Sequence, residues 1–116
     1  MGIFDWLFGV SKNKIEGNYK EEKREGLYKS YHENGQLESE GYYKCEIHGN
    51  LYFNLKDGLW KYYYDNGQLK SEGCYKGYIY VNGYNDNKKD GLWKYYNENG
   101  QLEKEIKFKD GEEIKN

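Results

Sequence analysis

Hydrophobic and polar positions repeat three times along the chain. In each copy Gly-Leu precedes an aromatic residue, a lysine and one to three tyrosines, and Asn-Gly separates this run from a second one that begins Gln-Leu. The copies align without gaps over residues 26–40, 58–72 and 91–105. Units of this kind cannot each bury an apolar face alone, so the pattern predicts a stacked repeat array.

Each copy is predicted to be a β-hairpin, because Asn-Gly is the preferred pair of a two-residue type I′ turn. A two-residue turn at Asn66-Gly67 pairs Tyr64 with Leu69, Tyr62 with Ser71, Lys61 with Glu72 and Trp60 with Gly73. The Lys–Glu pair recurs in the other copies, which supports this register, and Trp60 is expected to cover Gly73. A three-residue turn is expected to shift the register by one residue and lose these pairs.

Alternation along the predicted strands separates the apolar residues into two faces. The face predicted to form the core carries one aromatic residue and one leucine from each copy: Tyr28, Trp60, Trp93, Leu37, Leu69 and Leu102. The opposite face carries Tyr31, Tyr63 and Tyr96 among lysines and glutamates. Tyrosine offers a large contact area at low conformational entropy, so we expect partner binding on this second face.

Two connectors between the copies are 8 or 9 residues longer than the corresponding stretch before the first copy. The run Tyr78–Tyr84 alternates and then turns, and residues 47–53 can do the same around Gly49-Asn50. We therefore expect extra small hairpins or lengthened strands. Insertions in successive repeats project from one side of an array, often the binding side, so Tyr78 and Tyr80 join the candidate contact residues.

The N-terminal segment, residues 1–14, is predicted to be distinct from the repeat array of residues 15–116, whose copies start at about 26, 58 and 91. Its apolar residues include Phe4, Trp6, Leu7 and Phe8 and suit a short helix of two turns. One interpretation is a cap over the open end of the stack. The alternative is a contact with a membrane surface or a partner, with Lys12 and Lys14 near lipid headgroups.

Composition narrows the class of protein. The chain has 116 residues, no proline, 22 aromatic residues and a net charge of −2, which together predict one all-β unit. The absence of a basic surplus argues against nucleic-acid binding. Neither a membrane-spanning run nor a secretory signal is apparent, so we expect a cytoplasmic protein whose Cys45 and Cys74 are free thiols.

Candidate chemistry is sparse. His32 occupies a repeat position that holds Tyr64 and Asn97 in the other copies, which accounts for it without catalysis. Cys45 and His48 have only Cys74 as a plausible third metal ligand, whereas structural zinc sites use four. We therefore expect no enzyme activity, no cofactor and no metal site.

The pattern Gly-Leu-Trp-Lys-Tyr-Tyr-x-x-Asn-Gly-Gln-Leu-x-x-Glu, followed later by Lys-Asp-Gly-Leu-Trp, resembles the bacterial variant of the MORN repeat, and the chain is similar to the YwqK-type antitoxin family over residues 17–111. The resemblance implies an elongated single-layer antiparallel sheet of hairpins. It also implies protein binding, in some members as an antitoxin or immunity protein, and membrane or cytoskeletal association in the wider group. We expect a protein-binding module, for which the resemblance implies a cognate toxin as one form of partner, with a peripheral membrane or scaffold protein as the alternative and the oligomeric state open.

Overall fold

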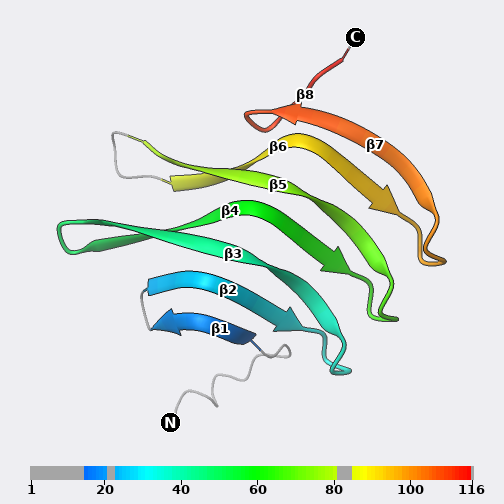
Figure 1. Ribbon diagram of the computed structural model, residues 1–116, viewed down its shortest axis with the longest axis horizontal. Helices are drawn as coiled ribbons and strands as arrows, with labels where there is room; N and C mark the ends of the chain where they lie inside the picture. Colours follow the sequence, from blue (N-terminus) through cyan, green and yellow to red (C-terminus); the bar gives the residue numbers. More distant parts are fainter. Residues whose placement is uncertain (1–14, 21–22, 81–84, 116) are drawn as a thin grey trace.

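The computed structural model describes residues 15–20, 23–80 and 85–115, and these form one antiparallel sheet with no helix among them. Its eight strands lie side by side in chain order (Figure 1). They are β1 (Ile15–Lys20), β2 (Lys23–Tyr31), β3 (Leu37–His48), β4 (Leu51–Tyr63), β5 (Leu69–Ile79), β6 (Asn85–Tyr96), β7 (Leu102–Lys109) and β8 (Glu112–Glu113). The all-β prediction is confirmed. The helix or cap predicted for residues 1–14 lies outside the described residues.

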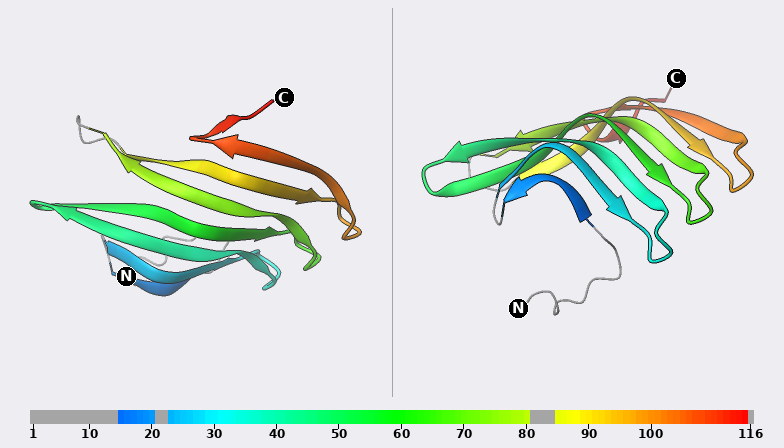
Figure 2. Two further views of the ribbon diagram at one scale, coloured as in Figure 1. Left: turned by 45° about the horizontal axis from the view of Figure 1, so that its top comes forward. Right: turned by 60° about the horizontal axis from the view of Figure 1, so that its bottom comes forward.

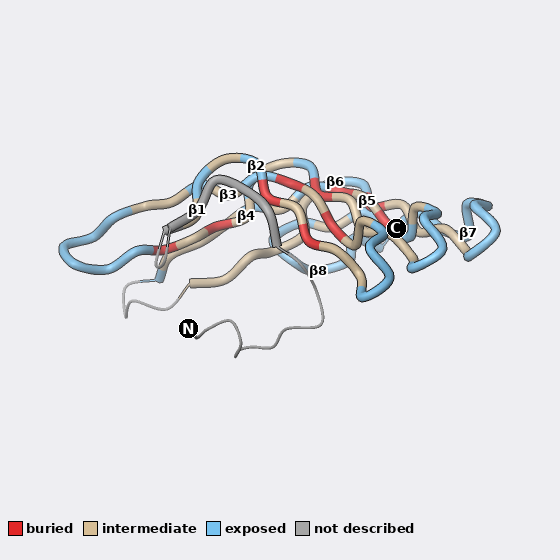
Figure 3. Tube along the Cα trace, turned by 90° about the horizontal axis from the view of Figure 1, so that it is seen from below, coloured by how far each residue is buried: buried red, intermediate tan, exposed pale blue. Residues whose placement is uncertain are grey.

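The sheet is a single arched layer (Figure 2). The molecule measures 47 × 40 × 19 Å, and in a view along the layer the buried residues lie in the middle of the strands (Figure 3). No second layer covers either face in the part of the chain that the structure describes. A core must therefore come from side chains that pack along one face against their neighbours in the same sheet.

The turns are longer than the predicted two residues. In the middle hairpin the Tyr64 amide donates to the Gln68 carbonyl at 2.8 Å, and the Gly67 amide donates to the Tyr64 carbonyl at 3.0 Å. Three residues therefore connect the strands, and Gly67 takes a φ of 92°, which favours glycine. The equivalent bonds close the first and third hairpins.

A β-bulge next to each turn restores the predicted strand register. In the middle hairpin Tyr63 pairs with Leu69 but Tyr62 pairs with Ser71, which leaves Lys70 as the extra residue. Beyond the bulge Lys61 opposes Glu72 and Trp60 opposes Gly73, as predicted. The predicted pairing of Tyr64 with Leu69 is wrong, because the third turn residue and the bulge compensate each other.

The bulge also moves the three leucines to the other face. Leu69 opposes Tyr63, and directly opposed residues of an antiparallel pair share a face. The same pairing joins Leu37 to Tyr31 and Leu102 to Tyr96. These leucines therefore do not belong to the packed face, and Leu102 is 51% exposed.

The long connectors form lengthened strands, one of the two predicted outcomes. The outer parts of β3 and β4 make a hairpin that turns at Gly49-Asn50, and it packs against the outer part of β5 and β6. A Cβ atom placed on Gly77 would lie 2.4 Å from the Leu55 Cβ. The Lys56 amide donates to the Asn87 side chain at 2.9 Å. This overlap buries Phe53 and Leu55, which we did not predict as core residues.

Candidate protein-binding surface

One face of the sheet, here called the tryptophan face, holds the core. Trp60 and Trp93 are each 1% exposed, and Tyr28 at the same repeat position is also buried. Each indole lies over a glycine of the preceding unit: a Cβ on Gly41 would come within 2.2 Å of the Trp60 ring, and a Cβ on Gly73 equally close to Trp93. The prediction that Trp60 covers Gly73 is therefore wrong, since the ring leans toward the neighbouring hairpin instead of its own.

Hydrogen bonds fix the tryptophans in this position. The Trp60 indole N–H donates to the Tyr42 carbonyl at 3.0 Å, and the Trp93 indole N–H donates to the Cys74 carbonyl at 2.9 Å. Both acceptors belong to the residue that follows the covered glycine. The same contact between an indole ring and the backbone thus joins successive hairpins. It explains how units that have no core of their own hold together.

A cation of the chain itself lies over the aromatic rings of each unit. The Lys56 Nζ is 4.6 Å from the centroid of the Trp60 ring and donates to the Tyr62 hydroxyl at 2.8 Å. Lys89 repeats the arrangement with Trp93 and Tyr95, and Arg24 lies 4.9 Å from the centroid of Tyr28. Burial lowers the pKa of Lys56. These aromatic sites are therefore occupied from within the fold.

The opposite face, here called the tyrosine face, carries Tyr31, Tyr63 and Tyr96 in one row at the ends of β2, β4 and β6. All three are half-buried. The Tyr63 hydroxyl donates to Glu40 Oε2 at 2.6 Å and the Tyr96 hydroxyl donates to Glu72 Oε2 at 2.9 Å. Burial and the bond to Glu40 raise the pKa of Tyr63, and the bond to Glu72 raises that of Tyr96. The structure thus brings the predicted row together and ties it to the preceding hairpins.

A row of alternating charge, here called the charge row, runs next to these tyrosines. Its members pair across five successive strand interfaces, in the order Lys29, Glu40, Lys61, Glu72, Lys94 and Glu105. Within the described residues the ion pairs shorter than 4.0 Å lie elsewhere, at Glu46 with Lys44 and His48. Tyrosine hydroxyls contact the Glu40 and Glu72 carboxylates instead. The three lysines of the row are half-buried.

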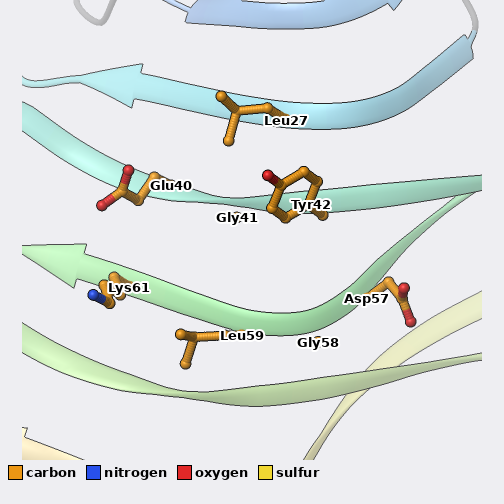
Figure 4. A pocket seen from close by; sticks show the side chains of 8 residues that line it. All are labelled: Leu27, Glu40, Gly41, Tyr42, Asp57, Gly58, Leu59 and Lys61. Carbon is orange, nitrogen blue, oxygen red and sulfur yellow. The ribbon is translucent and has the colours of Figure 1, made fainter.

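A band of exposed apolar side chains borders the charge row on its other side, and we call it the apolar stripe. Leu27, Tyr42, Leu59 and Leu92 are 40%, 55%, 50% and 43% exposed, and the exposed Cys74 lies between the last two. Figure 4 shows Leu27, Tyr42 and Leu59 projecting from β2, β3 and β4 around Gly41. They line a shallow hollow of about 520 Å³ together with Asp57 and Lys61. The stripe was not predicted from the sequence, although a leucine follows the first glycine of every copy.

Tyr78 and Tyr80 lie away from the tyrosine row, at the outer end of β5. The Tyr78 hydroxyl donates to Asp110 Oδ1, and this bond raises the pKa of Tyr78. The Lys88 Nζ is 5.5 Å from the centroid of the Tyr78 ring and 5.7 Å from that of Tyr80. The two tyrosines therefore form a separate cluster near the C-terminal turn. The other candidate contacts, Phe4, Trp6, Leu7 and Phe8, lie outside the described residues.

The histidines and cysteines were the candidate residues for catalysis or metal binding. His32 Nε2 donates to the Tyr63 carbonyl at 2.8 Å, and Tyr64 at the equivalent position donates its hydroxyl to the Tyr96 carbonyl at 2.7 Å. Cys45 and Cys74 are free thiols. Across residues 15–20, 23–80 and 85–115, no three His, Cys, Asp or Glu side chains are grouped to hold a metal ion. The same ranges contain no helix that is long and apolar enough to cross a membrane.

Stacked hairpins with a core on one face and an exposed apolar stripe on the other define a β-hairpin repeat protein. The MORN repeat variant model matches residues 24–44, 56–76 and 89–110, more than half of the chain, so the chain belongs to this family. MORN repeats are generally modules that bind proteins or membranes. No curated protein and no solved structure matched the chain.

Proposed function

We propose that this chain is a non-enzymatic, cytoplasmic module that binds a protein through its tyrosine face. The observation that carries the proposal is the apolar stripe, whose leucines and Tyr42 are 40–55% exposed on the same face as the row of tyrosines. Contiguous exposed apolar side chains rimmed by charge are typical of protein contact sites. The tryptophan face is less suited to this role, because its rings already pack on glycines and on the chain's own cations.

The more specific form of the proposal is that the partner is a toxin that the chain neutralises by direct binding. Its support is the resemblance to the YwqK-type antitoxin family, which is an argument from analogy. The tyrosine face suits such a role physically, because tyrosines tied down by Glu40 and Glu72 lose little further entropy when a partner covers them.

Affinity capture with matched variants tests the protein-binding proposal. The tagged full chain is compared with Leu59→Lys, which places a charge in the apolar stripe, and with Leu51→Lys, which makes the same change at a 59% exposed leucine at the start of β4. We expect one stoichiometric partner that is retained by Leu51→Lys and lost by Leu59→Lys. Equal capture by both variants, with unchanged circular dichroism, would exclude the tyrosine face.

Growth measurements test the toxin form of the proposal. Expression of the captured partner alone is expected to stop growth, and co-expression of the chain is expected to restore it. The Leu59→Lys variant is expected to fail in this rescue while Leu51→Lys succeeds. A partner that is harmless when expressed alone would rule out the antitoxin form and leave the binding function standing.

The alternative function is a peripheral membrane or scaffold protein anchored by Phe4, Trp6, Leu7 and Phe8. The pattern of large apolar residues followed by Lys12 and Lys14 in the sequence favours it. Deletion of residues 2–10 is expected to abolish sedimentation with anionic lipid vesicles if this alternative holds. Unchanged sedimentation of the shortened chain, or no sedimentation of the full chain, would exclude an anchor in this segment.

A further inference from the structure

The charge row is complementary to itself when its order is reversed. Every lysine lies on the first strand of a hairpin and every glutamate on the second, so the row alternates in sign across six strands. Reading the row from β7 to β2 exchanges each lysine with a glutamate. A two-fold rotation about an axis parallel to the strands, between β4 and β5, makes this reversal and places the tyrosine faces of two copies opposite each other.

Such a rotation pairs opposite charges along the whole row. Lys61 of one copy faces Glu72 of the other, Glu40 faces Lys94, and Lys29 faces Glu105, each contact occurring twice by symmetry. The central part of the apolar stripe is brought onto itself at the same time, with Leu59 facing Cys74 and Tyr42 facing Leu92. At the end of the stripe, Leu27 on β2 faces the Lys107 position on β7. Like charges would face each other if the copies were displaced by one strand, so the charge row excludes that displacement. The axis between β4 and β5 is the one that pairs all six members of the row.

We propose that two copies of this chain associate through their tyrosine faces, with the two-fold axis between β4 and β5. The arrangement is an aligned packing of two sheets, in which side chains of the facing layers interdigitate at a separation of about 10 Å. The ammonium groups of the charge row, which have no carboxylate within 4.0 Å among the described residues of their own chain, find one on the other copy.

The available area suits a specific but reversible dimer. Six strands spaced about 4.8 Å apart span roughly 30 Å, and the three rows from the tyrosines to the stripe add roughly 20 Å along the strands. Each copy would bury on the order of 600–800 Å² of accessible surface, near the lower end of stable specific interfaces. The charge row lies in the middle of this area, with the tyrosines on one side and the leucines of the stripe on the other.

This association goes beyond the proposed function and regulates the same surface, because a copy that covers the tyrosine face excludes any other partner. The two proposals fail separately. Self-association is measured on the purified full chain with no other protein present, whereas partner binding is measured by capture. A chain that remains monomeric in the first measurement can still capture a partner in the second.

Sedimentation velocity of the purified full chain over a range of micromolar concentrations tests the dimer. We expect a monomer–dimer equilibrium that weakens as salt is added, because the charge row is partly accessible to solvent before association. Lys61→Glu places glutamate opposite Glu72 at two symmetric positions and is expected to raise the dimer Kd at least about tenfold. The exchange Lys61→Glu with Glu72→Lys restores opposite charges and is expected to return the Kd to within about threefold of the original.

The stripe gives a second, independent pair of variants. Leu59→Lys is expected to abolish the dimer, and Leu51→Lys at the start of β4 is expected to leave it intact. Circular dichroism and tryptophan fluorescence establish that each variant is folded. A wild-type chain that stays monomeric throughout the concentration range overturns the proposal. So does a dimer that persists unchanged in folded Lys61→Glu and Leu59→Lys, since it would use another surface.

Discussion

The two faces of the sheet are made by the same strands but are built in different ways. On the tryptophan face the largest side chains are 1% exposed although no other described part of the chain covers the sheet, because each ring lies over a glycine of the preceding hairpin. On the tyrosine face every strand position carries a side chain, and Leu27, Leu59 and Leu92 remain 40–50% exposed. A single-layer sheet can therefore form a core on the face where glycines of neighbouring hairpins leave room for large rings. The other face, here the tyrosine face, keeps exposed side chains that can bind a partner.

The largest expected effect comes from removing a ring of the tryptophan face. Trp60→Ala deletes a buried indole together with its bond to the Tyr42 carbonyl, and we expect it to lower the free energy of unfolding by about 3–5 kcal/mol. The matched change on the other face is Leu59→Ala, at the residue directly before Trp60. It is 50% exposed and is expected to cost less than about 1 kcal/mol. Urea denaturation followed by circular dichroism measures both, and similar losses would contradict the contrast between the faces.

Filling the space under a ring tests the role of the glycines. Gly73→Ala adds a Cβ that would lie 2.2 Å from the Trp93 ring, so the ring must move, and we expect a loss of about 1–3 kcal/mol by overpacking. Cys74→Val adds volume at the adjacent exposed position of the tyrosine face and is expected to change stability by less than about 0.5 kcal/mol. Equal stability of Gly73→Ala and the original chain would mean that the ring does not depend on this space.

Alkaline pH tests the burial of Tyr62, which is on the tryptophan face. Burial and the bond to Tyr75 raise the pKa of Tyr62 above its ordinary value of 10.0. The unfolded phenol therefore ionises first, so stability from this group is complete below pH 10 and is lost as the pH rises further. Lys56 acts in the opposite sense, because its lowered pKa makes stability rise as the pH approaches 10.5. Urea denaturation at several alkaline pH values is expected to show a smaller loss above pH 10 for Tyr62→Phe than for the original chain.

Much of this fold followed from the repeat itself. Alternation placed Trp60 and Trp93 on the packed face, and the recurring Lys–Glu pair identified the register. The predicted two-residue turn was wrong, because the third turn residue and the β-bulge offset each other. That combination leaves unchanged the strand pairs that supported the prediction. The same bulge exchanged the face of Leu37, Leu69 and Leu102, which alternation alone does not reveal.

The candidate site was only partly predictable for a related reason. Tyr31, Tyr63 and Tyr96 share a repeat position, so their common row follows from the alignment of the copies. The glycine that each tryptophan covers depends on the direction in which the ring leans, which is a property of the assembled sheet. Burial of Phe53 and Leu55 likewise depends on the overlap of the outer hairpins, and no pattern within one copy describes that contact.

The smallest expected effect concerns the tyrosine row, where structure and binding overlap. Tyr63→Phe removes the hydroxyl that donates to Glu40 but keeps the ring, and we expect a loss of about 1 kcal/mol in the free energy of unfolding. If the ring contacts a partner, Phe keeps most of the affinity, whereas Tyr31→Ala, Tyr63→Ala and Tyr96→Ala combined abolish capture. Stability is read by urea denaturation and binding by titration with the captured partner.

A combined variant that unfolds would assign these tyrosines to the core and reduce the difference between the faces. A folded variant that binds normally would confine the contact to the apolar stripe, because the leucines and Tyr42 would then be the remaining large groups on that face.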